Sequence, residues 1–200
     1  MHLYTGVSRI FKPGPIEMNS EHNYLEINRE SWNNRTDIHL KSEFYDQEHF
    51  IKGKTSLNDI ELKLLGNIKG KSILHLQCHF GQDTISMNRL GAKVTGVDLS
   101  DKAINTAKKI VKETNSDAKF ICSDIYDLPN HLDEQFDIVY TSYGVIGWLP
   151  DLDKWAKVVS RFLKKNGVFV LVEFHPVVWM FDDSFDKIGY NYFNSGAIIE

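Results

Sequence analysis

The chain has 200 residues, 42% of them hydrophobic, and its 23 basic and 27 acidic side chains leave a net charge of −4. That length suits one domain, or one domain with an extension. The charge balance does not favour a nucleic-acid-binding protein, and the longest apolar stretch, Gly167–Phe174, is too short to cross a bilayer. We therefore expect neither a nucleic-acid partner nor a membrane partner.

The first 66 residues lack the pattern of a sheet. Residues 1–17 contain two prolines and no clear period, and we interpret them as an extension or a tag. Residues 18–66 are expected to form a helical cover, with a polar helical stretch from about 24 to 45. A capping-box-like start at Ser56–Asp59 predicts a further helix that ends near Gly66. Its expected apolar face consists of Leu57, Ile60, Leu64 and Leu65.

From residue 67 to residue 200 the sequence predicts an α/β domain. Short apolar strands alternate with amphipathic helices, which is typical of βαβ units with right-handed crossovers and a parallel sheet. The expected strands are Ser72–Gln77, Lys93–Asp98, Lys119–Cys122, Phe136–Thr141 and Val168–Phe174. The expected helices are Asp83–Leu90, Asp101–Glu113 and a third that begins at Asp151 or Asp153. These elements predict a three-layer, Rossmann-like fold with a mostly parallel sheet.

The stretch from Lys71 to Asp83 is the centre of the functional prediction. An apolar strand runs through a turn that contains Gly81 into the start of a helix, and this arrangement makes a nucleotide-sized anion site in α/β proteins. The next strand ends in Asp98, whose ionised carboxylate suits the two hydroxyls of a ribose. A dinucleotide fingerprint reads G-x-G-x-x-G, and this turn has one glycine, which disfavours NAD and FAD. Another nucleoside cofactor is therefore the leading interpretation.

The first strand and its turn, Ile73-Leu-His-Leu-Gln-Cys-His-Phe-Gly81, resemble those of the class I S-adenosylmethionine-dependent methyltransferases, which usually read I-L-D-L-G-C-G-x-G. The likeness spans about residues 70–175 and continues through Asp98, Cys122-Ser-Asp124 and Phe136-Asp-Ile-Val-Tyr140. This resemblance implies S-adenosyl-L-methionine as the cofactor and methyl transfer as the activity.

Three positions depart from the family pattern. His75 stands at the usual aspartate, and Gln77 and His79 stand at the first two glycines, so two side chains are added near the methionine end of the cofactor. The segment from Trp32 to His39 also resembles a bacterial subgroup with a Trp-Asn-x-Arg-Thr-x-x-His stretch.

The resemblance assigns cofactor roles to residues at the strand ends. Asp98 would bind the ribose, Asp124 would lie near the adenine amino group, and Leu99 or Ile125 would pack on the adenine. The residues implied nearer the methionine end are Gln77, His79, Gly81 and Tyr143.

These residues also have purely structural interpretations. Asp98 and Asp124 can cap a helix or a turn, although Ser100 already supplies a cap for the helix after Asp98. His79 can be a loop histidine packed on its neighbour. His75, in the middle of a strand, is more often a buried, hydrogen-bonded histidine than a ligand.

The segment Thr141–Trp148 after the fourth strand faces the methyl group and the substrate in the resembled family. Tyr143 and Trp148 offer aromatic faces to a sulfonium, or they serve packing alone. Trp32 and Arg35 are the other expected substrate-binding residues, because N-terminal extensions often close over the cofactor in this family. The acceptor is expected to be a small molecule.

The catalytic residue stays open. Methyl transfer from a sulfonium mainly needs alignment, and it needs a general base only where the nucleophile loses a proton. The candidates are His39, Tyr143 and His175, with Glu173 as a further possible base.

Two cysteines, Cys78 and Cys122, indicate a reducing compartment, so a cytoplasmic location is expected. The first and third expected strands, which carry them, are predicted to lie on either side of Lys93–Asp98. The two cysteines would then be roughly 9–10 Å apart, a distance that a disulfide does not span. A metal site built from His75, Cys78 and His79 lacks an obvious fourth ligand, so no metal is expected.

Two other function classes stay open. One is a sensor or subunit that binds S-adenosylmethionine without catalysis, and silent methyl-transfer assays despite tight cofactor binding would favour it. The other is an NAD-dependent oxidoreductase, which the missing glycines disfavour. Titration with both cofactors separates the two.

The resembled family has seven strands, whereas this sequence predicts five, followed after Phe174 by an aromatic tail. We therefore expect the C-terminal strands to be missing, which leaves the cofactor half intact and the substrate half incomplete. Leu171 and Val172 would then lie on an open edge strand. A second copy of the chain, or the tail folding back through Ala197–Ile199, would cover that edge.

Overall fold

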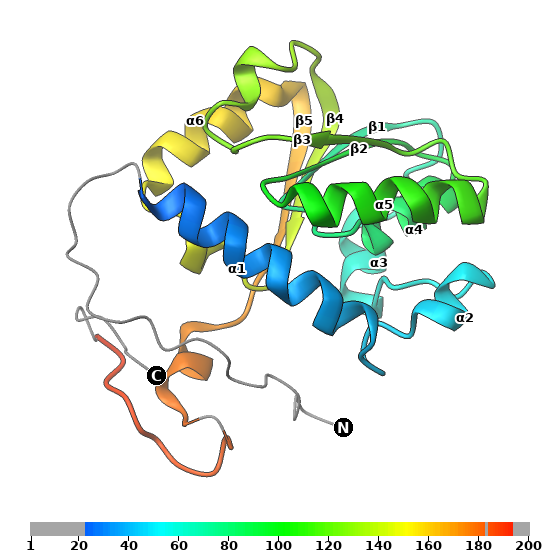
Figure 1. Ribbon diagram of the computed structural model, residues 1–200. Coiled ribbons are helices and arrows are strands. Elements are labelled where there is room, and N and C mark those ends of the chain that lie inside the picture. Colours follow the sequence, from blue (N-terminus) through cyan, green and yellow to red (C-terminus); the bar gives the residue numbers. More distant parts are fainter. Residues whose placement is uncertain (1–22, 183, 194–200) are drawn as a thin grey trace. The chain divides into compact units, whose positions relative to one another are not determined.

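A computed structural model describes residues 23–182 and 184–193 (Figure 1). The expected extension, 1–17, and the suggested edge-covering segment, Ala197–Ile199, lie outside the described residues. The larger compact unit of the chain runs from Glu21 to Glu173, and a second unit begins at Phe174. Every helix and strand that positions the candidate site belongs to the larger unit.

Five strands form one parallel sheet in the order β3-β2-β1-β4-β5. The strands are β1 Ser72–Leu76, β2 Lys93–Asp98, β3 Lys119–Cys122, β4 Phe136–Ser142 and β5 Leu163–Val172. Leu76 lies beside Val97 and Asp98 lies beside Cys122, so the carboxyl ends of β1, β2 and β3 meet at one edge. The predicted α/β fold with a parallel sheet is confirmed.

Helices cover both faces of this sheet: α4 Gln82–Arg89, α5 Asp101–Thr114 and α6 Leu152–Phe162. Ile73 points into a core cluster that includes Met87 of α4, whereas its neighbour Leu74 points into a cluster with Trp155 and Phe162 of α6. Successive residues of a strand face opposite sides, so both faces of β1 are buried. This explains why the inner strands read as continuous apolar runs.

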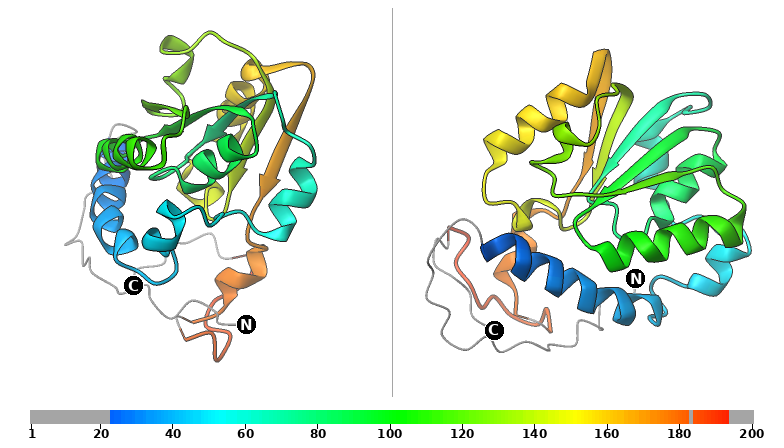
Figure 2. Two further views of the ribbon diagram at one scale, coloured as in Figure 1. Left: turned by 90° about the vertical axis from the view of Figure 1, so that its right-hand side faces the viewer. Right: turned by 45° about the horizontal axis from the view of Figure 1, so that its top comes forward.

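Three helices precede the sheet: α1 Asn23–Leu40, α2 Gln47–Ile51 and α3 Asp59–Leu65. Helix α1 runs alongside α5 (Figure 2). Short 3-10 helices lie at Leu128–Asn130, Ile146–Trp148 and Pro176–Met180. Among the described residues, none of the helices has the length and apolar character that a membrane span requires.

The start of α3 differs from the prediction. Its N-cap is Asn58, and the capping box joins Asn58 to Glu61 rather than Ser56 to Asp59. The Ser56 hydroxyl instead donates to Asp83 of α4 at 2.6 Å. This hydroxyl, which the capping-box pattern had assigned to the N-cap of α3, is therefore used in a contact with another helix.

The predicted apolar face of α3 is half wrong. Leu57 and Leu65 are each 5% exposed and pack in the core, as expected. Ile60 and Leu64 are 58% and 54% exposed, because the turn of the helix places them on its outer side.

Strand β5 begins at Leu163 instead of Val168, because α6 passes into the strand without a loop and Leu163 pairs with Phe136. The register then shifts, and regular pairing resumes where Val168 meets Ile138. Strand β5 is an edge strand of the described sheet. Whether a partner or the tail covers that edge stays a prediction.

The second unit contains a 3-10 helix, Pro176–Met180, and an antiparallel bridge between Phe181 and Ile188. The side chain of His175 accepts a hydrogen bond from the backbone N–H of Val177 at the start of that helix. His175 therefore has a local capping role in this unit.

Candidate functional site

The turn after β1, residues 77–81, lies at the carboxyl edge of the sheet. The backbone N–H of Cys78 donates to the carbonyl oxygen of Val97 at 2.9 Å, which extends the β1–β2 ladder into the turn. Gln77 and His79 have φ angles of 54° and 51°, in the left-handed region. Glycine reaches this region freely, whereas other residues pay about 1–2 kcal/mol. The positions at which the family usually has glycine thus require glycine-like backbone here too.

Gly81 is the N-cap residue of α4, with a φ of 79°. A Cβ at this position would lie 2.4 Å from the ring of Phe120, which is far closer than side chains approach. The N–H of Gly81 donates to the carbonyl oxygen of Cys78 at 2.9 Å. Packing against β3, together with the positive φ, is therefore sufficient to require glycine here.

Asp98, at the end of β2, faces this turn. One carboxylate oxygen accepts from the backbone N–H of His79 at 2.7 Å and the other from the N–H of Ser100 at 2.8 Å. Burial raises the pKa of Asp98 to about 6, although the N–H donors counteract the shift. Ser100, not Asp98, caps α5, because its hydroxyl accepts from Ala103 at 2.9 Å. Each oxygen of Asp98 keeps a lone pair for a further donor such as a ribose hydroxyl.

Polar groups at the turn have no partner within the described part of the chain. Gln77 Oε1 and His79 Nδ1 are buried without a hydrogen bond. The first-turn N–H groups of α4, on Gln82, Asp83 and Thr84, likewise donate to no described residue. Donors and acceptors that lie unpaired at one edge fit a ligand that carries both an ammonium and a carboxylate group. We call the turn 77–81 together with Asp98 the sheet-edge site.

His79 joins the sheet-edge site to α1. Its Nε2 lies 3.0 Å from Nδ1 of His39, and its ring centroid lies 5.3 Å from that of Trp32. Burial lowers the pKa of His79 to about 3 and that of His39 to about 4, and the positive charge of Arg35 adds to both shifts. Both imidazoles are therefore neutral at pH 7.

Three aromatic and basic residues continue this contact. The guanidinium carbon of Arg35 lies 5.7 Å from the ring centroid of Trp32 and 5.4 Å from that of Trp148. The two indole rings lie edge to face, 5.3 Å apart. The structure thus brings together the three predicted substrate-binding residues. The cover cluster is the group formed by Trp32, Arg35, His39, His79 and Trp148.

Glu173 fixes the loop after β4 by hydrogen bonds. Its carboxylate accepts from the backbone N–H groups of Gly144, Val145 and Ile146, at 2.7 Å in the case of Val145. Glu173 therefore positions the loop that carries Trp148. The sequence analysis had considered Glu173 as a base, whereas the geometry gives Glu173 a structural role.

Tyr143 lies against α3. Its hydroxyl donates to Glu61, and its ring packs on the core cluster that contains Leu57 and Leu65. Burial raises the pKa of the Tyr143 hydroxyl well above its usual value, and the bond to Glu61 adds to the shift. The prediction had placed this ring near the cofactor methyl group, whereas the structure directs its hydroxyl to α3.

The predicted adenine contacts follow β2 and β3. Leu99 is half-buried directly after Asp98, and Asp124 accepts from the N–H of Tyr126 at 3.3 Å. Burial raises the pKa of Asp124. Ile125 is buried in the core cluster beneath α6, so Leu99 is the more accessible of the two apolar candidates.

His75 is a buried, hydrogen-bonded histidine. Its Nδ1 lies 2.8 Å from the hydroxyl of Thr84, its ring packs against Tyr140, and burial lowers its pKa to about 3. Within residues 23–182 and 184–193, no group of three or more His, Cys, Asp or Glu side chains is arranged to hold a metal.

Asn33 fixes α1 on the start of α5, and sequence reasoning missed it. Its Nδ2 donates to Asp101 at 2.9 Å, and its Oδ1 accepts from the Ser100 hydroxyl and the Lys102 N–H. Its place beside Trp32 in the sequence was the available signal.

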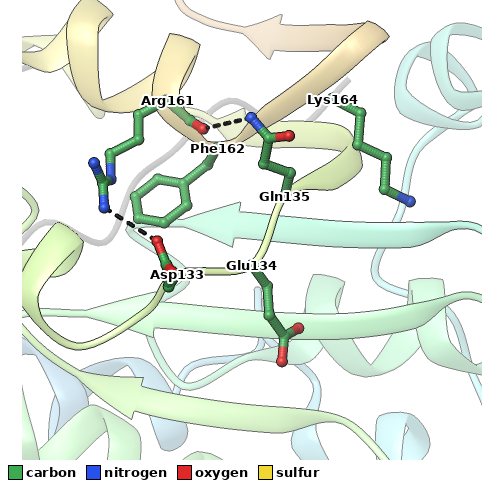
Figure 3. Close-up of a pocket in the computed structure, with 6 residues that line it drawn as sticks. All are labelled: Asp133, Glu134, Gln135, Arg161, Phe162 and Lys164. Carbon is green, nitrogen blue, oxygen red and sulfur yellow. Dashed lines mark hydrogen bonds and ion pairs between the residues drawn. The ribbon is translucent and has the colours of Figure 1, made fainter.

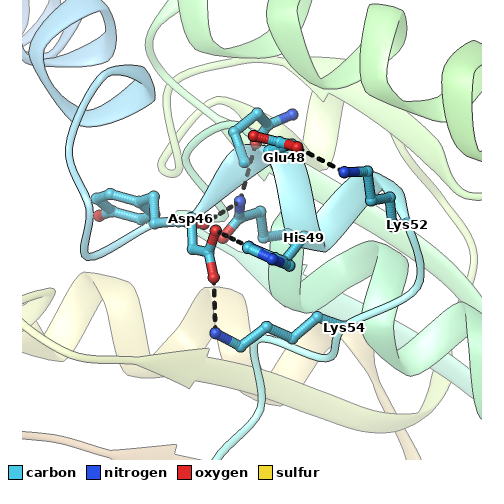
Figure 4. Close-up of polar contacts among 8 residues, drawn as sticks. Asp46, Glu48, His49, Lys52 and Lys54 are labelled. Atoms are coloured by element: carbon cyan, nitrogen blue, oxygen red, sulfur yellow. Dashed lines mark hydrogen bonds and ion pairs between the residues drawn. The ribbon is translucent and has the colours of Figure 1, made fainter.

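The segment after α1 is fixed by further polar contacts. Asp46 bonds His49 and Lys54 at 2.7 and 2.8 Å (Figure 4), and these partners, Lys54 first, lower the pKa of Asp46 to about 2. Gln82 at the start of α4 donates to the carbonyl oxygen of Tyr45 at 2.8 Å. The cover is thereby tied to the same helix that borders the sheet-edge site.

A cavity elsewhere on the sheet does not belong to this site. It is lined by Asp133, Glu134, Gln135, Arg161, Phe162 and Lys164 (Figure 3). These residues surround the start of β4 and the end of α6, which is the amino edge of the strands. Cofactors in open α/β sheets bind at the carboxyl edge, where the sheet-edge site lies.

The comparison with known proteins agrees with this geometry. Residues 74–171 match the family model described as a methyltransferase domain. An uncharacterised methyltransferase of Synechocystis is 33% identical over 133 residues, which cover 66% of this chain and 60% of that protein. The α/β domain is a class I S-adenosylmethionine-dependent methyltransferase domain. S-adenosylmethionine is accordingly its cofactor.

Further relatives of this methyltransferase domain include a ubiquinone biosynthesis O-methyltransferase of Idiomarina loihiensis, 27% identical over 132 residues, with 64% of this chain and 54% of that protein covered. The chain thus spans less than two thirds of the length of either relative.

Solved structures share the fold. The DhpI–SAH complex superposes with a TM-score of 0.59 at 20% identity over 77% of this chain and 71% of that one. A protein of Pyrococcus horikoshii gives a TM-score of 0.53 at 27% identity over 66% and 59% of the two chains.

Proposed function

We propose that this protein transfers the methyl group of S-adenosylmethionine to a small-molecule acceptor. The observation that carries the proposal is the position of Asp98, buried at the end of β2 and facing the turn 77–81, with acceptor capacity left on both oxygens. The name of the Idiomarina relative refers to ubiquinone biosynthesis, which supports a small-molecule acceptor.

Each end of the cofactor has candidate partners at the sheet edge. Asp98 binds the ribose hydroxyls, Leu99 packs on the adenine, and Asp124 accepts from the adenine amino group. Gln77, His79 and the first-turn N–H groups of α4 bind the amino-acid end, because these groups lack partners among the described residues. The side chains of Ile125 and Tyr143 pack on the core clusters and support the walls of the site.

The bound cofactor supplies a methyl group made electrophilic by a sulfonium sulfur. The task of the chain is to align the acceptor with that group and to exclude water, which can contribute about 7–11 kcal/mol in favourable cases. His39 and His79, neutral at pH 7, are the candidate general bases where the acceptor loses a proton. They lie in the cover cluster, between α1 and the turn.

The test is acceptor-dependent release of S-adenosylhomocysteine. We expect the wild-type protein, supplied with S-adenosylmethionine and a panel of hydroxyl, amine, thiol and carboxylate compounds, to release it with a subset of the panel. At a cofactor concentration near the wild-type Kd, Asp98→Ala should reduce the release strongly, because its affinity for the cofactor is lower. Asp117→Ala, which changes an exposed acid beyond the far end of α5, is the matched control. Cofactor binding with no release for any compound favours a non-catalytic binding protein.

A further inference from the structure

Arg35 lies on the face of α1 that points at the sheet-edge site. Residues 32, 35 and 39 are spaced by three and four positions, so they share one face of the helix. The contacts of Trp32 and His39 with His79 show that this face meets the turn after β1. The side chain of Arg35 is half-buried there, beside the indole rings of Trp32 and Trp148.

The guanidinium of Arg35 has no acidic partner among the described residues. Its Nε donates to the Ser31 hydroxyl at 3.4 Å, and neither Nη group has a hydrogen bond in the described part of the chain. Two other arginines have such partners: Arg89 uses both Nη groups on backbone carbonyl oxygens, and Arg161 pairs with Asp133 at 3.2 Å. Within the described residues, this half-buried cation with two unused donors therefore lacks an anion.

The charge of the cover cluster indicates which anion would fit. Arg35 supplies its one positive charge, because burial keeps both His39 and His79 neutral at pH 7. A carboxylate carries a single negative charge and matches the guanidinium fork with two parallel hydrogen bonds. A phosphate brings about 1.5–2 negative charges, which one arginine does not balance. The flanking rings of Trp32 and Trp148 favour a flat apolar body next to the charged group.

We propose that Arg35 binds a carboxylate group of the methyl acceptor, so that the acceptor is a small carboxylic acid with a planar apolar part. This inference rests on the proposed methyl transfer and names its substrate class. The carboxylate of the cofactor is the other possible source of the same chemistry. The unpaired first-turn N–H groups of α4 are available to that carboxylate, which leaves Arg35 for the acceptor.

The test is calorimetry with acid and amide pairs on protein saturated with S-adenosylhomocysteine. Benzoate and phenylacetate are the probes, and benzamide and phenylacetamide are their uncharged counterparts. We expect at least one acid to bind at least tenfold more tightly than its amide. Arg35→Gln should reduce the affinity of that acid to the level of its amide and leave the affinity for S-adenosylhomocysteine within twofold. Arg29→Gln, an exposed arginine on the same helix, should change neither.

Four results would overturn the proposal. Equal binding of acids and amides, or no binding of either acid, would show that the site does not recognise a carboxylate on the acceptor. Unchanged acid affinity in Arg35→Gln removes Arg35 from its recognition. A large loss of S-adenosylhomocysteine affinity in Arg35→Gln assigns Arg35 to the cofactor instead. Failure of the wild-type protein to bind S-adenosylhomocysteine would contradict the proposed function, and the acid–amide comparison without cofactor would still report on Arg35.

Discussion

The sheet-edge site and the cover cluster keep their shapes by different means. At the sheet edge, backbone groups make the contacts: Asp98 accepts from the N–H groups of His79 and Ser100, and the β1–β2 ladder continues to Cys78. In the cover cluster, side chains make them, through edge-to-face rings, an imidazole pair and a guanidinium. Backbone contacts survive most sequence changes, whereas side-chain contacts depend on residue identity.

This difference indicates a division of work. A backbone-built site suits the part of the reaction that is common to the family, which is binding of the cofactor. A cluster built from specific side chains suits the part that varies between enzymes, which is recognition of the acceptor. Changes at the sheet edge should therefore affect stability and cofactor affinity, and changes in the cover cluster should affect turnover.

The largest expected effect is that of Gly81→Ala on stability. The left-handed φ costs about 1–2 kcal/mol for a side chain, and contact with Phe120 adds about 1–3 kcal/mol of overpacking. Urea unfolding measures the sum. Gly144→Ala is the matched control, because Gly144 has a φ of 75° and open space around its Cβ position. An equal loss of unfolding free energy in both variants would show that the packing against Phe120 is unimportant.

The attachment of the cover gives the next largest effect. Asn33→Ala removes the polar contacts of α1 with the start of α5, at an expected cost of about 1–2 kcal/mol in unfolding free energy. We expect turnover to fall more than cofactor affinity does, because the sheet-edge site stays intact. Asn34→Ala, at an exposed position of the same helix, should leave both unchanged. A parallel loss of turnover and cofactor affinity would contradict the division of work.

Cofactor affinity should depend on pH through Asp98. Burial raises the pKa of this carboxyl to about 6, and ribose hydroxyls bind its ionised form, so cofactor binding lowers that pKa. Affinity is then constant above about pH 7 and falls by up to about tenfold per pH unit below pH 6. Calorimetry between pH 5 and pH 8 measures the change.

Asp98→Asn should flatten this pH profile, and that variant is needed because the buried Asp83 also has a raised pKa. His39 and His79, with pKa values of about 4 and 3, stay neutral over the same interval. A profile that keeps its slope in Asp98→Asn would assign the titration to another group.

The smallest expected effect concerns the added side chain at His79. His79→Gly removes the backbone strain and also the contact with His39, so the melting temperature should change little. Loss of the hydrogen bond that we propose between His79 Nδ1 and the bound cofactor should weaken cofactor binding by about 1 kcal/mol. His79→Ala keeps the strain, and it should be less stable than His79→Gly by about 1–2 kcal/mol. A His79→Gly variant that melts early and binds the cofactor normally would give His79 a structural role alone.

The elements of the sheet were predictable because their signals are local. Apolar runs fixed β2 and β3 at their observed bounds, and Ser100 was predicted as the cap of α5. The start of α3 was missed because the hydroxyl of Ser56 is taken by Asp83, a residue 27 positions away. Local capping rules do not include such a competitor.

The site was predictable only in part for the same reason. Asp98 and the turn follow from their positions after strands. The pair His39–His79 joins residues 40 positions apart, and the bond between Asn33 and Asp101 joins residues 68 apart. Hydrophobic periodicity does not predict contacts between residues so far apart in the sequence. The hydrogen bond from Tyr143 to Glu61 could not be predicted for the same reason.

The most direct test is calorimetric titration of S-adenosylmethionine into the wild-type protein and Asp98→Ala, with NAD titrated in parallel. We expect the wild-type protein to bind S-adenosylmethionine and not NAD. Loss of the charge-assisted hydrogen bonds in Asp98→Ala should weaken binding by about 1.5–3 kcal/mol, which is roughly 10- to 150-fold in Kd. Binding of NAD in place of S-adenosylmethionine, or equal affinity of the two proteins for S-adenosylmethionine, would contradict the assignment of the sheet-edge site.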